Sequence, residues 1–147
     1  MKKNTLVLAI LLLGYTAFAQ NTNTLLNNYL SVKNALVSGD EKAATQAIST
    51  LYQSIQSESN FAQKEALLKA TEKLVKASSI EKQRAVFNDV STTMWQLVKS
   101  TTRVSQPVYY QYCPMKKAYW LSNEAAIKNP YYGSSMLTCG KVSETKN

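Results

Sequence analysis

The chain of 147 residues is long enough for one domain with its own apolar core, and 45% of its residues are hydrophobic. It contains no histidine, which excludes Ser-His-Asp and Cys-His catalysis and every histidine metal ligand. The 9 acidic residues are dispersed, and the 17 basic residues behind the net charge of +8 lack the dense clustering typical of nucleic-acid binding. Composition therefore argues against an enzyme and against nucleic acid as a partner.

The amino-terminal segment has the three parts of an export signal. Two lysines precede an apolar run from Leu6 to Leu13, which is too short to span a membrane. The sequence Ala17-Phe18-Ala19 then supplies the small residues that signal peptidase accepts. We predict that residues 1–19 are a cleaved signal peptide and that the mature protein is periplasmic or secreted. No later segment is apolar enough to cross a bilayer, so we expect no membrane span after cleavage.

From about Asn23 to Arg103 the chain has helical periodicity. Apolar residues recur every three or four positions in the first two segments, as on one face of a helix. These residues are Leu25, Tyr29, Val32 and Leu36, followed by Ala44, Ile48, Leu51 and Ile55. Between the two segments, Gly39 suits the left-handed residue that ends a helix, and Asp40 suits the capping position of the next one.

Two further helical segments are expected. The third runs from Phe61 to Ala77. The fourth has an apolar stripe that consists of Phe87, Val90, Met94 and Leu97. Ser78, followed three residues later by Glu81, matches the capping box at the start of a helix. Four amphipathic helices with short connections predict a mainly α protein in which residues 20–104 form an up-and-down four-helix bundle.

Residues 105–147 have a different composition, and we expect them to cap the bundle as part of the same domain. All three prolines, both cysteines and six of the nine tyrosines lie there, and prolines at this density rule out a long helix. Alternating side chains predict a short strand from Val108 to Tyr112. Ser122 suits the start of a short helix that ends at Ile127, and the sequence from Asn129 to Gly133 is typical of a turn.

Two short sulfur motifs stand in this cap, Cys113-Pro114-Met115 and Met136-Leu137-Thr138-Cys139. Each motif joins a thiol to a thioether. Such soft donors select monovalent copper over zinc, calcium or magnesium. The motifs therefore predict a metal site whose ligands are Cys113, Met115, Met136 and Cys139.

The two cysteines also have a competing interpretation. A cysteine pair in an exported protein most often forms a structural disulfide. A bond between Cys113 and Cys139 would close a loop of about 26 residues and stabilise the fold by roughly 3–4 kcal/mol. A redox-active pair has less support, because the chain has no C-x-x-C motif. The metal site and the disulfide are alternatives, since an oxidised pair cannot supply two thiolates.

Five motifs carry a family resemblance. They are Ile80-Glu81-Lys82-Gln83-Arg84 with Phe87, Tyr110-Gln111-Tyr112-Cys113-Pro114-Met115, Tyr119-Trp120-Leu121-Ser122, Ile127-Lys128-Asn129-Pro130-Tyr131-Tyr132-Gly133 and Met136-Leu137-Thr138-Cys139-Gly140. Over about Leu25 to Val142 the chain resembles a bacterial family known only as a domain of unknown function. Members of that family look like stand-alone exported proteins, or like a module fused to periplasmic adaptor subunits of heavy-metal efflux pumps. The resemblance therefore implies copper or a related metal.

A second likeness points the same way. The segment Tyr112-Cys113-Pro114-Met115 is similar to the start of the heavy-metal-binding motif Y-x-C-P-M-H-P of copper-transport proteins. Lys116 stands where that motif has histidine, and Lys117 stands where it has proline. This chain therefore lacks the histidine ligand that the motif would supply.

Residues and resemblance together predict a periplasmic module that binds monovalent copper and takes part in metal handling or efflux. The expected partner is a heavy-metal efflux adaptor or a copper chaperone. The alternative is a non-catalytic structural or interaction domain of the cell envelope that contains a Cys113–Cys139 disulfide. Neither prediction makes the chain an enzyme.

Overall fold

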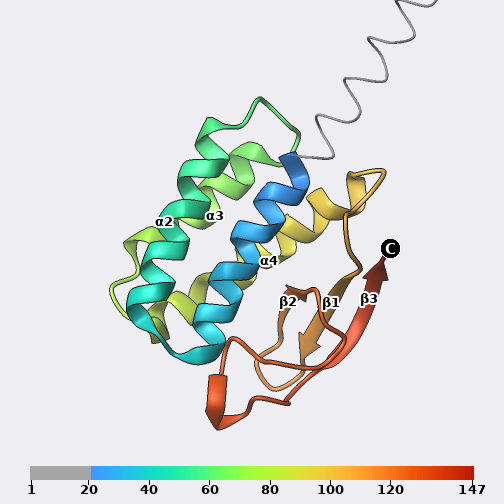
Figure 1. Ribbon diagram of the computed structural model, residues 1–147. Coiled ribbons are helices and arrows are strands. Elements are labelled where there is room, and N and C mark those ends of the chain that lie inside the picture. The colour runs from blue at the N-terminus through green and yellow to red at the C-terminus, as the bar shows by residue number, and fades with distance from the viewer. Residues whose placement is uncertain (1–20) are drawn as a thin grey trace, which may run out of the picture.

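The computed structural model describes residues 21–147, so the predicted signal peptide lies outside the described part. Within it the chain is mainly helical, with four helices and one small antiparallel sheet (Figure 1). The helices are residues 21–38, α2 (Glu41–Ser57), α3 (Lys64–Lys76) and α4 (Ile80–Ser100). The strands are β1 (Val108–Cys113), β2 (Ala118–Ser122) and β3 (Lys141–Lys146), and the 3-10 helix η1 (Gly133–Ser135) precedes β3. The prediction of a mainly helical protein is confirmed.

The boundary between the first helix and α2 is set by Gly39 and Asp40, as the sequence predicted. Gly39 has a φ of +76°, and its N–H donates to the carbonyl of Ala35 at 3.0 Å. The carboxylate of Asp40 accepts a hydrogen bond from the N–H of Ala43 at 2.9 Å, which satisfies a donor in the first turn of α2. Two residues therefore suffice to end one helix and begin the next.

The start of α4 differs from the prediction by one residue. Ser79 is the capping residue, and its hydroxyl accepts from the N–H of Lys82 at 3.4 Å. The hydroxyl of Ser78 instead accepts from the ammonium group of Lys82 at 3.0 Å. Glu81 is therefore the second residue of the helix rather than the third, and the predicted capping box is wrong.

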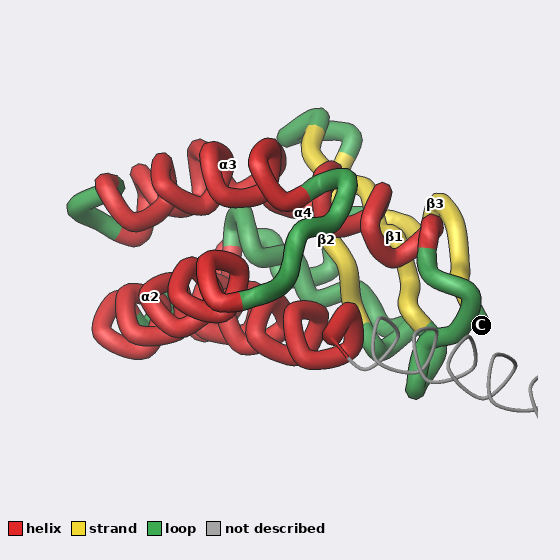
Figure 2. The backbone as a smooth tube through the Cα atoms, turned by 90° about the horizontal axis from the view of Figure 1, so that it is seen from above, coloured by secondary structure: helices red, strands yellow, loops and turns green. Residues whose placement is uncertain are grey.

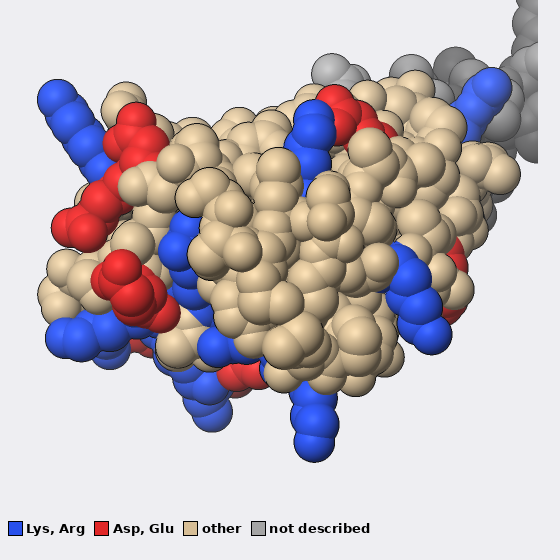
Figure 3. Space-filling model, turned by 90° about the horizontal axis from the view of Figure 1, so that it is seen from below, with Lys and Arg blue, Asp and Glu red and all other residues tan. Residues whose placement is uncertain are grey.

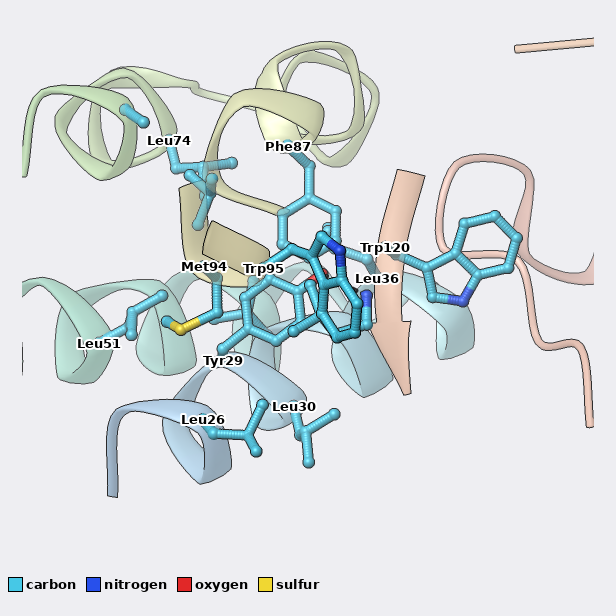
Figure 4. Packing of buried hydrophobic residues seen from close by; sticks show 14 of the residues in the cluster. Leu26, Tyr29, Leu30, Leu36, Leu51, Leu74, Phe87, Met94, Trp95 and Trp120 are labelled. Atoms are coloured by element: carbon cyan, nitrogen blue, oxygen red, sulfur yellow. Dashed lines mark hydrogen bonds between the residues drawn. The ribbon is translucent and has the colours of Figure 1, made fainter. Parts of the chain in front are cut away.

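The apolar core lies where side chains from all four helices and from β2 meet (Figure 4). Tyr29 and Phe87 stack at its centre with ring centroids 5.2 Å apart, and both side chains are fully buried. Met94 is also fully buried, which agrees with its place on the predicted apolar stripe. Trp95 stacks on Tyr110 of β1 at 4.8 Å, so aromatic packing extends from α4 onto the sheet.

The sheet has the strand order β2-β1-β3, and β2 lies nearest the helices (Figure 2). Helix side chains bond the outer edge of β2. The N–H of Leu121 donates to the Tyr29 hydroxyl at 3.0 Å, and the N–H of Tyr119 donates to Asn88 Oδ1 at 2.9 Å. The Tyr29 hydroxyl also lies 2.7 Å from Ser91 Oγ on α4. An edge strand otherwise presents unpaired N–H groups, so these contacts fasten the cap to the bundle.

The cap departs from the prediction after β2. Residues 123–126 form bends, and the helix expected from Ser122 to Ile127 is absent from the described chain. The buried side chain of Gln111 donates through Nε2 to the carbonyls of Glu124 at 3.0 Å and Ala125 at 3.2 Å, so these carbonyls are not available to a helix.

The sequence predicted a cap with short strands or turns, but it located only the first strand and not β2 or β3. All but one of the β2 residues are buried, and β3 is exposed along almost its whole length. Neither strand therefore shows the alternation of buried and exposed residues by which a half-buried strand is found in a sequence.

On one face of the molecule, basic and acidic side chains lie next to one another around a broad uncharged area (Figure 3). Ion pairs on the surface are few and exposed, as in the pair between Lys73 and Asp89 at 2.9 Å, and such pairs contribute about 0–1 kcal/mol each. None of the helices within residues 21–147 has the length and apolar character needed to cross a membrane.

Tyr29→Phe should lower the free energy of unfolding by about 1–3 kcal/mol, because it leaves the buried N–H of Leu121 without its acceptor. Urea unfolding followed by circular dichroism measures this change. Tyr52→Phe makes the same substitution at a half-buried position of α2 and should change the free energy by less than about 0.5 kcal/mol. Equal effects of the two substitutions would contradict the role given to Tyr29.

Candidate functional site

The two cysteines meet at one end of the sheet. Cys113 is the last residue of β1, and Cys139 lies just before β3, whose Lys141 pairs with Tyr112. The antiparallel pairing of the two strands therefore brings together residues that are 26 positions apart, and their Sγ atoms lie 3.1 Å from each other. Both residues are free thiols, with Cys113 buried and Cys139 half-buried.

The turn that follows β1 directs hydrogen-bond donors at the Cys113 sulfur. Residues 114–117 form this turn, in which Lys117 has a φ of +54°. The N–H of Lys116 donates to Cys113 Sγ at 3.4 Å, and the N–H of Met115 and the side-chain amide of Asn129 also interact with it. Donors of this kind stabilise the charged thiolate rather than the neutral thiol.

The two thiols have opposite pKa shifts. Burial by itself raises the pKa of Cys113, but the hydrogen bonds from Cys139, Lys116, Asn129 and Met115 outweigh it, so that the pKa is lowered. The hydrogen bond with Cys113 raises the pKa of Cys139. The contact between the two sulfur atoms, 3.1 Å apart, therefore favours the thiolate at Cys113 over the thiolate at Cys139.

The methionines of the two sulfur motifs flank this pair. Met115 lies in the turn after β1, its side chain is 65% exposed, and its N–H interacts with both thiols. Met136 is half-buried, and its carbonyl accepts from the N–H of Cys139 at 3.1 Å, which closes the turn that carries Cys139. Within residues 21–147, none of the hydrogen bonds joins a methionine sulfur to either thiol. The structure thus brings the two predicted thiols together and leaves both methionines beside them.

Asn129 organises the loop that holds Cys139. Its side-chain Nδ2 donates to the carbonyl of Cys139 at 2.7 Å, and its Oδ1 accepts from the N–H of Tyr131 at 2.8 Å. Its backbone N–H donates to the carbonyl of Leu137 at 2.8 Å, and its carbonyl accepts from Gly133 at 3.0 Å. The sequence indicated only a turn at Asn129-Pro130, because its four partners are assembled by the folded loop.

Gly140 allows this loop to lie close to the sheet. It has a φ of +152°, and a Cβ atom here would lie 2.7 Å from the ring of Trp120 and 3.1 Å from the carbonyl of Tyr112. Any larger residue would therefore push the chain away from Trp120. Because Gly140 follows Cys139 directly, this close approach also fixes the position of the second thiol.

A buried lysine supports the neighbouring loop. Lys33, on the first helix, is only 1% exposed, and burial is the main cause of its lowered pKa. The charge of Glu124 opposes this effect, and that of Lys128 adds to it. Lys33 therefore lies near the loop that contains Glu124, whose carbonyl accepts a hydrogen bond from Gln111. We assign this lysine a structural role.

The donors near the thiol pair suit only a narrow class of metal ions. Within the described residues, no group of three or more Cys, Asp or Glu side chains is placed to hold a metal ion. Zinc sites usually need four nitrogen, sulfur or carboxylate ligands, and calcium and magnesium need oxygen ligands. Two thiols 3.1 Å apart are soft donors, and donors of this kind suit a monovalent ion that accepts few ligands.

These features describe a mainly helical protein with an attached three-stranded sheet and a thiol pair at one end of that sheet. The chain belongs to the family described as protein of unknown function (DUF3347), whose model matches residues 25–106. No curated protein and no solved structure matches the chain. The matched range covers the helices and ends before β1, so the sulfur motifs lie outside it.

Asn129→Ala should lower the free energy of unfolding by about 2–4 kcal/mol, because the buried carbonyl of Cys139 and the N–H of Tyr131 each lose a partner. Chemical unfolding followed by tryptophan fluorescence measures the change. The control is Asn123→Ala, an identical substitution at an exposed position in the same segment. If both variants were equally stable, Asn129 would not be the organiser of the Cys139 loop.

Proposed function

We propose that the thiol pair binds one soft monovalent metal ion, with monovalent copper as the physiological ligand. The observation that carries this proposal is the meeting of Cys113 and Cys139 at 3.1 Å beneath N–H donors aimed at Cys113 Sγ. Thiolate is the form of cysteine that binds metals, and these donors favour it. Two negative thiolates offset the charge of a monovalent cation without further acidic ligands.

In this proposal each of the four sulfur residues has a defined role. Cys113 and Cys139 supply the charged ligands, and Met115 and Met136 supply neutral thioethers from the two flanking turns. The bound ion would remain coordinated by soft donors, which keep copper in its monovalent state. Asn129 and the N–H of Lys116 hold the thiolates in place, as groups around metal ligands commonly do.

The proposed module binds and passes on metal but does not catalyse a reaction. Its up-and-down helical bundle serves as a scaffold, and the cap presents the sulfur residues at one end of the sheet. We place it in the periplasm or outside the cell, after removal of the signal peptide. A heavy-metal efflux adaptor or a copper chaperone is the partner that best suits this activity.

A second function is favoured by the same contact. Two sulfur atoms 3.1 Å apart need to move little to form a covalent bond, so an oxidising compartment would convert the pair into a disulfide. The protein would then be a structural or interaction domain of the cell envelope. The disulfide removes both thiolates. Oxidation should therefore abolish the function of a metal-binding module, whereas it should complete the fold of a structural domain.

Reduced protein should bind one monovalent copper ion in competition with a chromophoric chelator, and oxidised protein should bind it orders of magnitude more weakly. Cys113→Ser should weaken binding by more than the roughly 10- to 100-fold that changes around metal ligands cost. Met115→Leu and Met136→Leu should weaken it less, because a thioether carries no charge. Absorbance of the chelator complex measures the affinity of each protein.

Met94→Leu is the matched control, since it makes the same substitution in the core and should leave copper affinity unchanged. Glu124→Gln tests whether the protein is instead an enzyme, because an enzyme would depend more on its acidic residues than on its sulfur residues. Absence of copper binding by the reduced protein would end the metal proposal and leave the disulfide. Equal binding by reduced and oxidised protein would exclude the thiol pair as the site.

A further inference from the structure

Solvent reaches the two cysteines unequally. Cys113 has no exposed surface, because it closes β1 beneath the turn of residues 114–117. Cys139 lies in the loop before β3 and is half-buried. A small reagent from solution therefore meets the sulfur of Cys139 first, and the sulfur of Cys113 lies 3.1 Å behind it. This order of access determines which sulfur an external thiol or disulfide can attack.

We propose that the pair exchanges with external low-molecular-mass thiols and disulfides, with Cys139 as the entry sulfur and Cys113 as the internal resolving sulfur. This activity does not depend on metal binding. It cycles the same two residues between the disulfide and the dithiol, whereas the proposed metal site uses them only when they are reduced.

The exchange conserves sulfur bonds and electrons at each step. In one direction, an external thiolate attacks Cys139 Sγ, a new disulfide forms between them, and the bond from Cys139 to Cys113 breaks. The electron pair of the broken bond leaves on Cys113 Sγ as a thiolate. In the other direction, the Cys139 thiolate attacks an external disulfide and releases one thiolate, and Cys113 then attacks Cys139 Sγ and releases the second. Overall, a dithiol and an external disulfide become a protein disulfide and two external thiols.

The surroundings of Cys113 suit its role as the sulfur that leaves. The N–H of Lys116 donates to Cys113 Sγ at 3.4 Å, and the side-chain amide of Asn129 lies against the same sulfur. These donors surround Cys113 Sγ in the reduced pair, so they stabilise the negative charge left on that sulfur once the bond has broken. Cys139 has fewer such partners, namely Cys113 itself and the N–H of Met115.

Positive charge at this end of the sheet selects the class of external thiol. Lys116 and Lys117 lie exposed in the turn after Cys113, and Lys141 lies exposed two residues after Cys139. A thiol that carries carboxylates is attracted to this cluster, and a cationic thiol is repelled. We therefore assign the site to small acidic thiols, for which glutathione is the probe.

The test uses the full mature protein after oxidation with oxidised glutathione. Limiting reduced glutathione is added, the reaction is quenched with acid, and free thiols are labelled with a maleimide before peptide mass spectrometry. Glutathione should be found on Cys139 and the maleimide on Cys113. Glutathione on Cys113, an even distribution over both, or no mixed disulfide would overturn the proposal.

Single-cysteine variants provide a second test. Cys113→Ser should accumulate a stable glutathione adduct on Cys139, because no resolving thiol remains. Cys139→Ser should react with oxidised glutathione at least about tenfold more slowly than Cys113→Ser does, because limited access slows the reaction of a buried thiol. Helical circular dichroism shows whether Cys139→Ser is folded. If the folded Cys139→Ser variant reacted faster than Cys113→Ser, the proposal would be contradicted.

A charge comparison tests the assigned class of thiol. We compare the rates at which glutathione and the cationic thiol cysteamine reduce a disulfide. The ratio of the glutathione rate to the cysteamine rate should be larger for the oxidised protein than for a neutral small disulfide. This excess should fall as salt is added, because salt screens the charges. No excess at low salt would overturn the preference for acidic thiols. Copper titration of the reduced protein is read separately, so failure of exchange and failure of metal binding are distinguishable.

Discussion

The hydroxyl of Tyr29 is the contact on which the arrangement of bundle and cap depends. It accepts the N–H of Leu121 from the edge of β2 and lies 2.7 Å from Ser91 Oγ on α4, which in turn donates to the carbonyl of Phe87. This chain of hydrogen bonds links the first helix, α4 and the sheet inside the core. Burial raises the pKa of Tyr29 far above its usual range, so the hydroxyl stays neutral and can both accept and donate.

From this anchor the position of the thiol site follows strand by strand. The edge of β2 is held by Tyr29 and Asn88, β1 pairs with β2, and β3 pairs with β1. The end of β1 and the start of β3 therefore meet at a defined place. Asn129 completes the arrangement, because it ties the loop before β3 into a compact unit around Cys139. The cap is thus a rigid support for two turns, each carrying one cysteine and one methionine.

The two thiols differ although they are in contact. Cys113 is buried and receives hydrogen bonds from the turn that follows it, whereas Cys139 is half-buried, and the two sulfur atoms lie 3.1 Å apart. A metal ion would replace the thiol protons and hold two thiolates, and oxidation would replace them with a covalent bond. The proposed metal binding, the alternative disulfide and the proposed exchange would therefore be three uses of one pair, and the oxidation state of the compartment would decide among them.

The sequence by itself identified the helices and the sulfur residues of the candidate site, and the tertiary structure decided the rest. Periodicity of apolar residues and the Gly39-Asp40 pair identified the helical part, because helix signals are local. The four sulfur residues of the candidate site could also be named from two short motifs. Sequence could not find β2 and β3, because their burial depends on neighbours that are distant along the chain. The same reason applies to the roles of Tyr29 and Asn129 and to the unequal burial of the two cysteines. Each depends on contacts between residues that are distant along the chain, and such contacts exist only in the folded protein.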